Sequence, residues 1–132
     1  MWGECRAQQP GAAAVGAIDN MQVWDPRGAP TCSHRDVYQD LLPLEDAQIL
    51  ELGCGKADFS RTLAAAERSA SITAMEVDTA QHAENLAGPQ LENLSFALGG
   101  AEKIPAANEN FDIVLMMKSL HHVPAALMAQ AM

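Results

Sequence analysis

Positive charge is scarce in this chain of 132 residues, which carries 8 Lys and Arg against 17 Asp and Glu and a formal net charge of −9. The basic residues are scattered along the sequence, without a run or a stripe. Proteins that grip nucleic acid through its phosphates need a basic patch. We therefore expect no nucleic-acid partner.

Cysteine and long apolar runs are scarce as well. The three cysteines, Cys5, Cys32 and Cys54, are an odd number without a short pairing, so neither a disulfide framework nor a zinc spacing is visible. Cys32 and His34 could begin a metal site, but no second pair of ligands follows, and we expect no metal and a reducing, cytoplasmic location. No apolar run approaches the roughly 20 residues of a membrane span, so we expect no membrane partner either.

The sequence does have the composition of one soluble globular domain, with 48% hydrophobic and 19% charged residues. Residues 1–36 stand apart, because they are rich in Ala, Gly, Gln and Pro and lack periodicity. We expect a mobile or irregular segment there, with Trp24 docking on the body, and one domain over residues 37–132. A short helix through Val37–Leu42 opens that domain and ends at Pro43.

Apolar strands and amphipathic helices alternate from Gln48 onward. The strands are expected at Ile49–Leu52, Ser71–Met75, Asn93–Leu98 and Phe111–Met117, and the helices at Asp58–Ala66, at Thr79–Leu86 and from near Pro124. This alternation predicts an α/β fold, a Rossmann-like doubly wound parallel sheet with helices on both faces. The near-continuous apolar run of the fourth strand indicates a central strand that is covered on both faces.

The turn after the first expected strand carries the clearest functional signal. Gly53 and Gly55 remove two side chains where a strand turns into a helix, so a ligand can approach the backbone there. A tight turn without a ligand is the alternative. Glu76 favours a ligand, because an acid at the end of the next strand can accept hydrogen bonds from two ribose hydroxyls. The neighbouring Asp78 is better explained as the cap of the following helix.

Charge discriminates among nucleoside-containing ligands. A nicotinamide dinucleotide requires G-x-G-x-x-G, but Asp58 stands at the sixth position. Glu51 and Asp58 would also repel its pyrophosphate. An acidic turn suits S-adenosylmethionine, which has a sulfonium and an ammonium group and no phosphate, and we expect this cofactor rather than NAD.

Four motifs in order resemble the class I S-adenosylmethionine-dependent methyltransferases. Residues 49–55 are similar to motif I and residues 72–78 to the second motif, while residues 100–105 with 111–114 resemble D-A-x-x-L-P followed by F-D-x-V. Ser119–Val123 resembles the small-molecule, ubiquinone-biosynthesis-like branch. The resemblance covers roughly residues 36–132. It implies strand order 3-2-1-4 and a C-terminally incomplete domain that stops before strands five to seven of the family's seven-stranded sheet.

The resemblance also implies cofactor-binding positions: Glu51, Gly53, Cys54, Gly55, Glu76, Val77, Ala101, Glu102 and Lys118. In this assignment Glu51 lies near the methionine ammonium, the glycines back the methionyl and ribose portions, and Glu76 holds the ribose hydroxyls. Ala101 and Glu102 border the adenine, and Lys118 lies beneath the sulfonium region.

The chain departs from the family pattern at two positions. Ala57 replaces the third glycine of G-x-G-x-G, a change that is tolerable if its φ is negative. Gly100 replaces the acid that often touches the adenine amine, so adenine recognition passes to Glu102, backbone groups and stacking.

Methyl transfer is an in-line displacement at an activated carbon, for which a protein mainly supplies alignment. His121 and His122 follow the fourth strand and are the candidate bases for an acceptor that must lose a proton. Their alternative roles are a turn cap and a packing residue. Cys54 is interpreted as structural rather than as a nucleophile.

The sequence thus predicts a methyltransferase that uses S-adenosylmethionine and acts on a small molecule. A non-catalytic cofactor-binding or partner protein with the same fold is the alternative, and an NAD-dependent oxidoreductase is less favoured. Because the family's later strands are not in the chain, we expect strand four to present an open hydrophobic edge through which the chain could form oligomers, and the half-domain to be marginally stable.

Overall fold

The computed structural model describes residues 31–67, 70–107 and 109–132. It divides into two units, Met1–Leu42 and Pro43–Met132. Most of the segment expected to be mobile or irregular, including Trp24, lies outside the described residues. Among the described residues, no helix is long and apolar enough to cross a membrane.

The first unit contributes α1 (His34–Leu41). Ser33 caps this helix: its hydroxyl accepts from the Asp36 N–H at 3.1 Å, and the Asp36 carboxylate accepts from the Ser33 N–H at 3.1 Å. This capping box starts the helix three residues before the expected Val37, so residues 34–36 are helical rather than irregular. The helix ends as predicted, because Leu42 precedes Pro43 and is extended.

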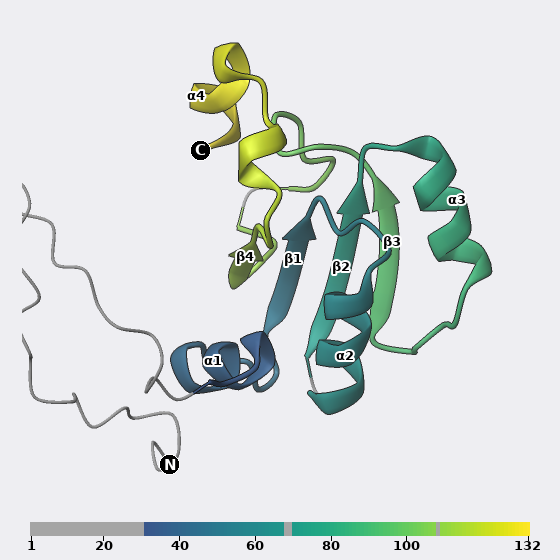
Figure 1. The fold of residues 1–132 in the computed structure, drawn as a ribbon, viewed down its shortest axis with the longest axis vertical. Helices are drawn as coiled ribbons and strands as arrows, with labels where there is room; N and C mark the ends of the chain where they lie inside the picture. The colour runs from purple at the N-terminus through teal and green to yellow at the C-terminus, as the bar shows by residue number, and fades with distance from the viewer. Residues whose placement is uncertain (1–30, 68–69, 108) are drawn as a thin grey trace, which may run out of the picture. The chain divides into compact units, whose positions relative to one another are not determined.

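Four strands of the second unit form one parallel sheet (Figure 1). They are β1 (Gln48–Leu52), β2 (Ser71–Glu76), β3 (Leu94–Leu98) and β4 (Ile113–Leu115). Their order is β3-β2-β1-β4 and every neighbouring pair is parallel, so the predicted fold class and strand order are confirmed. The order reverses between β1 and β4, which is where sheets of this kind bind ligands, beyond the carboxyl ends of the strands.

Two helices, α2 (Asp58–Ala66) and α3 (Thr79–Ala87), pack against β2 and β3. Each connects two successive strands (Figure 1). The Asp78 carboxylate caps α3 by accepting from the N–H groups of Ala80 and Gln81, at 2.8 and 3.2 Å. The predicted capping role of Asp78 is therefore confirmed.

Alternation along β1 gives the two faces of the sheet different partners. Glu51 contacts Ser60 of α2, so it lies on the face that carries this helix. Leu50 and Leu52 belong to the opposite face, where they form a buried cluster with Met75 and Ala101, called the Leu50 cluster below. Partly buried side chains from the later chain pack against this cluster: Ala97, Ile104, Phe111, Met116, Val123 and Ala131.

The fourth strand is shorter and more exposed than the sequence predicts. It spans three residues instead of Phe111–Met117, and the side chain of Val114 is 53% exposed. Phe111 and Met116 pack against the Leu50 cluster instead of extending the strand. The expectation of a central strand covered on both faces is therefore wrong for the described residues, in which β4 pairs with β1 and forms the edge of the sheet. The open edge is as expected there, while oligomer formation stays a prediction.

The chain after β4 forms short turns of helix at the carboxyl end of the sheet (Figure 1). These are η2 (Leu120–His122), η3 (Ala125–Leu127) and α4 (Met128–Ala131). The helix expected from near Pro124 thus begins as a 3-10 turn. Gln130 of α4 donates from Nε2 to the Glu102 carbonyl oxygen at 2.8 Å, which ties this segment to the loop after β3.

Candidate functional site

The glycine-rich turn, residues 53–57, connects β1 to α2. Gly53 has φ +72° and Gly55 has φ +53°, a left-handed backbone that favours glycine. The N–H groups of Gly53 and Cys54 both donate to the Met75 carbonyl oxygen at 2.9 Å. The turn is therefore attached to the end of β2 by its own backbone.

The two glycines meet different surroundings. A Cβ built on Gly53 would lie 2.5 Å from the Ser119 Cβ, so only glycine allows the segment after β4 to approach this closely. The Ser119 hydroxyl donates to the Leu52 carbonyl oxygen at 2.6 Å and fixes the approach. A Cβ on Gly55 would meet no atom within 4 Å. Gly55 thus faces open space into which a ligand could come against the backbone.

Ala57 is also left-handed, with φ +58°, and its side chain is fully buried. Ala57 therefore does not meet the condition of a negative φ under which the replacement of the third glycine is expected to be tolerable. The turn keeps the conformation that a third glycine would adopt, although alanine in this region costs about 1–2 kcal/mol. The replacement conserves the shape of the turn at some cost in stability.

Glu76 ends β2, and backbone donors hold its carboxylate from two directions. Its Oε2 accepts from the Gly55 N–H at 2.7 Å, and its Oε1 accepts from the N–H groups of Val77 and Asp78 at 2.8 and 3.1 Å. A carboxylate offers about four lone-pair sites, so these three bonds leave it able to accept from a hydroxyl. The group is buried and already oriented beside the open space at Gly55.

Glu51 is the second buried carboxylate near the turn, with a side chain only 3% exposed. Burial raises its pKa above the ordinary value, and the hydrogen bond that its Oε2 accepts from the Ser60 hydroxyl partly opposes this rise. A buried carboxylate with one hydroxyl donor is stabilised by any cation that reaches it. Ser60 was not singled out from the sequence.

Cys54 lies between the two glycines. Burial raises the pKa of its thiol to about 12, and the Glu51 and Glu76 carboxylates contribute to the rise. The thiol therefore stays protonated at neutral pH and is a poor nucleophile. This supports the interpretation of Cys54 as structural.

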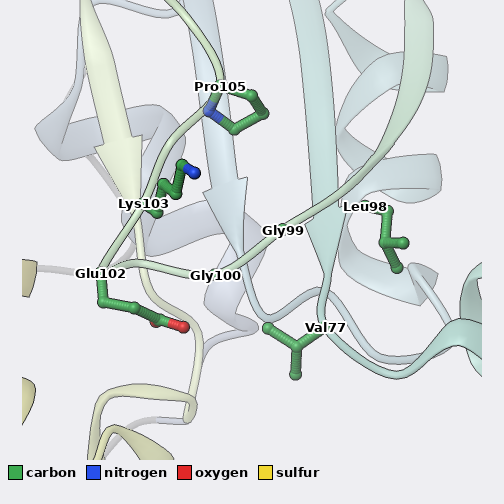
Figure 2. Close-up of a pocket in the computed structure, with 7 residues that line it drawn as sticks. All are labelled: Val77, Leu98, Gly99, Gly100, Glu102, Lys103 and Pro105. Atoms are coloured by element: carbon green, nitrogen blue, oxygen red, sulfur yellow. The ribbon is translucent and has the colours of Figure 1, made fainter.

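A cavity of about 360 Å³ opens beyond the carboxyl ends of β2 and β3 (Figure 2). Its lining residues are Val77, Leu98, Gly99, Gly100, Glu102, Lys103 and Pro105. Val77 is 61% exposed and provides an apolar wall directly after Glu76. The cavity wall thus begins one residue after Glu76 and combines apolar side chains with the charged Glu102 and Lys103.

Glu102 occupies the place that a side chain at position 100 would fill. A Cβ built on Gly100 would lie 2.6 Å from the Glu102 Oε2 and 2.9 Å from a Val77 methyl group. Figure 2 shows the Glu102 and Val77 side chains extending toward each other next to Gly100. The Ala101 side chain belongs to the Leu50 cluster, so a ligand contact of Ala101 is left to its backbone.

The candidate bases and Lys118 lie in the segment after β4. Lys118 is exposed and left-handed, with φ +58°. His121 and His122 are exposed in η2, and their ring centroids are 3.9 Å apart. The His122 N–H donates to the Ser119 carbonyl oxygen at 2.9 Å, so η2 follows directly from the residue that packs on Gly53.

These surroundings fit a cationic nucleoside ligand. Two buried carboxylates flank the turn, Gly55 faces open space, and the cavity lined by Val77 begins directly after Glu76 in the chain. Within residues 31–67, 70–107 and 109–132, no group of three or more His, Cys, Asp or Glu could hold a metal ion.

Comparison with known proteins identifies the family. A family model described as a methyltransferase domain matches residues 49–132. The phthiotriol/phenolphthiotriol dimycocerosates methyltransferase of Mycobacterium leprae is 33% identical over 91 residues, which are 69% of this chain and 33% of the relative. The chain spans about a third of the length of the curated relatives that it matches first.

Solved structures share the fold. A methyltransferase from an antibiotic biosynthesis pathway of Anabaena variabilis superposes with a TM-score of 0.62 at 18% identity, covering 74% of this chain and 37% of that one. PKMT2 of Rickettsia typhi, solved with S-adenosylhomocysteine, has a TM-score of 0.56 at 14% identity, covering 67% and 18%. With the ordered motifs, the strand order and the family match together, this chain belongs to the class I S-adenosylmethionine-dependent methyltransferases.

Proposed function

We propose that the chain binds S-adenosylmethionine at the glycine-rich turn and the adjoining cavity and directs its methyl group to a small-molecule acceptor. The observation that carries the proposal is the Glu76 carboxylate, which three backbone N–H groups hold beside the open space at Gly55. A carboxylate fixed in this way needs no reorientation to accept one further hydrogen bond from a ribose hydroxyl.

Each part of the site has a partner in the cofactor. The exposed side chains of Val77 and Leu98 offer apolar surface to the adenine, and the Glu102 carboxylate offers an acceptor to its amine. Gly53, Cys54 and Gly55 provide the backbone along the ribose and methionyl portions. Glu51 provides negative charge for the ammonium group.

The bound cofactor supplies an activated methyl carbon, and the chain supplies alignment. Ser119 holds the segment after β4 against Gly53, so Lys118, His121 and His122 stay at the carboxyl end of the sheet, where the turn also lies. Imidazole is suited to take a proton from an acceptor near neutral pH. We assign this role to His121 or His122.

A small-molecule acceptor is supported by the names of two similar proteins. One relative is called a phthiotriol/phenolphthiotriol dimycocerosates methyltransferase, and one structural neighbour belongs to an antibiotic biosynthesis pathway. The acidic composition, with 17 acidic against 8 basic residues, also disfavours a phosphate-rich acceptor.

Calorimetry with S-adenosylhomocysteine tests the cofactor site. Glu76→Gln should weaken binding roughly ten- to hundredfold, because the charged acceptor of a hydroxyl hydrogen bond is lost. Glu92→Gln removes the same charge from an exposed position before β3 and should leave the affinity unchanged. Equal affinities of the two variants at matched thermal stability would refute the assignment of Glu76.

Transfer of a radiolabelled methyl group to a panel of small hydroxylated acceptors tests the activity. His121→Ala or His122→Ala should slow transfer while binding of S-adenosylhomocysteine stays as in the wild type. Binding without transfer to any acceptor would favour the non-catalytic alternative. Thermal stabilisation by NADH but not by S-adenosylmethionine would favour an oxidoreductase.

A further inference from the structure

A buried asparagine of α3 reaches the glycine-rich turn from behind. Asn85 is only 2% exposed, and its Nδ2 donates to the Gly55 carbonyl oxygen at 2.7 Å. The same nitrogen lies 3.7 Å from the Cys54 Sγ, and the Asn85 Oδ1 accepts from the Gln81 Nε2 at 3.4 Å. The amide is therefore used on both sides, and its shortest hydrogen bond goes to the turn.

An arginine of α2 holds the next carbonyl of the turn. The Arg61 Nη1 donates to the Lys56 carbonyl oxygen at 2.6 Å. Its Nη2 and Nε donate to the carbonyl oxygens of Asn85 and Pro89 at 3.1 and 3.3 Å, and its guanidinium lies 5.1 Å from the centre of the Phe96 ring. Each of these hydrogen bonds ends at a backbone carbonyl, so the side chain links the turn to the end of α3.

The Asn85 contact and the Glu76 contact together fix Gly55, which has no side chain that could hold it in place. Gly55 has no side chain, and no atom lies within 4 Å of where its Cβ would be. Its N–H is held by Glu76 and its carbonyl by Asn85, so both peptide groups that flank its rotatable bonds are oriented. Without these hydrogen bonds a glycine would sample many backbone conformations.

We propose that Asn85 and Arg61 are positioning residues that keep the glycine-rich turn in its cofactor-binding shape before the cofactor arrives. The inference rests on the proposed function for its consequence, which is affinity. A turn that is ordered only part of the time binds with an affinity reduced by that fraction. Neither residue lines the cavity, so both act through the backbone of the turn.

The structure offers a matched control in Gln90. Its Nε2 donates to the carbonyl oxygens of Asn85, Leu86 and Gly88 at 3.3, 3.0 and 2.8 Å. It thus secures the end of α3 as Arg61 does, but none of these bonds reaches the turn. Loss of Gln90 reports the purely structural contribution of this region.

The test compares Asn85→Leu with Gln90→Leu by calorimetry with S-adenosylhomocysteine and by hydrogen exchange of the turn amides without ligand. Asn85→Leu should weaken binding roughly five- to hundredfold, because the partly buried Gly55 carbonyl loses its amide donor, and should speed exchange at Gly55. Gln90→Leu should change neither. In methyl transfer, the KM for the cofactor should rise while kcat at saturation is retained.

Two further results keep the inference open to refutation. If Asn85→Leu fails to fold, Arg61→Lys takes its place in the test. Lysine retains the charge but cannot reach all three carbonyl oxygens, so this variant should show the same changes in binding and exchange, but smaller ones. Wild-type binding and exchange in Asn85→Leu or Arg61→Lys would overturn the inference. If the wild-type chain itself does not bind, the proposed function fails on that result, and exchange at Gly55 still decides whether Asn85 and Arg61 hold the turn.

Discussion

The turn after β1 and the segment after β4 both begin at the carboxyl end of the sheet, but different contacts hold them in place. In the glycine-rich turn, backbone groups are bonded to β2, Glu76, Asn85 and Arg61. The segment after β4 is fixed to the turn through the buried Ser119 and then continues into two exposed histidines. The glycine-rich turn, the proposed cofactor half of the site, is thus held by hydrogen bonds to its own backbone. The histidines proposed for the acceptor half lie exposed in a segment that is held by Ser119, by Gln130 and by apolar packing.

Gly53 is where the two regions meet, and its replacement should have the largest effect. Gly53→Ala combines a left-handed alanine with a methyl group 2.5 Å from the Ser119 Cβ, so we expect a loss of about 3 kcal/mol or more in the free energy of unfolding. Gly55→Ala meets open space and should lose only about 1–2 kcal/mol.

Urea unfolding of both variants measures the difference. Ser119→Gly removes the clashing Cβ and should recover part of the loss in the double variant with Gly53→Ala. Equal losses for the two alanine variants would mean that the two regions are not coupled through Gly53.

Glu51 tests the turn side alone, through opposite effects on binding and stability. Its pKa is raised by burial above 4.5, so the folded chain binds this proton more tightly than the unfolded chain does. The stability that this group contributes is present below pH 4.5 and is lost as the pH rises through the raised pKa. Glu51→Gln should therefore be more stable than the wild type at pH 7, and the gain should disappear near pH 4.

The same substitution should weaken binding of S-adenosylhomocysteine about tenfold, because it removes the charge expected to face the ammonium group. Urea unfolding between pH 4 and 7 and calorimetry at pH 7 provide the two measurements. A stability difference that does not vary with pH would contradict the raised pKa of the buried Glu51 carboxyl.

Ala57 should give the smallest effect. Ala57→Gly relieves the left-handed alanine but removes a buried methyl group, so we expect the free energy of unfolding to rise by a few tenths to about 1 kcal/mol. Ala64→Gly, at a buried position within α2, should instead lower it by about 1 kcal/mol. Thermal unfolding of the pair checks the opposite signs, and a loss of stability in both variants would show that the turn tolerates alanine without strain.

The sequence predicts the features that depend on local pattern. Apolar alternation predicts the strands, the glycines predict the turn, Pro43 predicts the end of α1, and Asp78 predicts the start of α3. The strand order is implied by the family resemblance rather than by the local pattern. The exposure of Val114 in β4 does not follow from the apolar sequence of this strand, because burial depends on which neighbouring elements are present.

Two of the residues that sequence analysis missed act over long separations. Asn85 lies 30 positions from Gly55, and Ser119 lies 67 positions from Leu52, so no local spacing links them. The φ of Ala57 was also missed, because the conformation of the turn is set by its attachment to β2 rather than by the residue itself. The sequence does offer one signal for Asn85, which is an uncharged polar residue inside a predicted helix. Such a residue is hydrogen-bonded when it is buried.

Because the Cys54 thiol stays protonated in the folded chain, its reaction with thiol reagents can measure the rate at which the glycine-rich turn opens. Thiol reagents attack thiolates, so at neutral pH they should label the exposed Cys32 well before Cys54, whose pKa is about 12. When the turn opens, Cys54 leaves the influence of the two carboxylates and becomes reactive. Its labelling rate in excess reagent therefore reports how often the glycine-rich turn opens, without any cofactor being added.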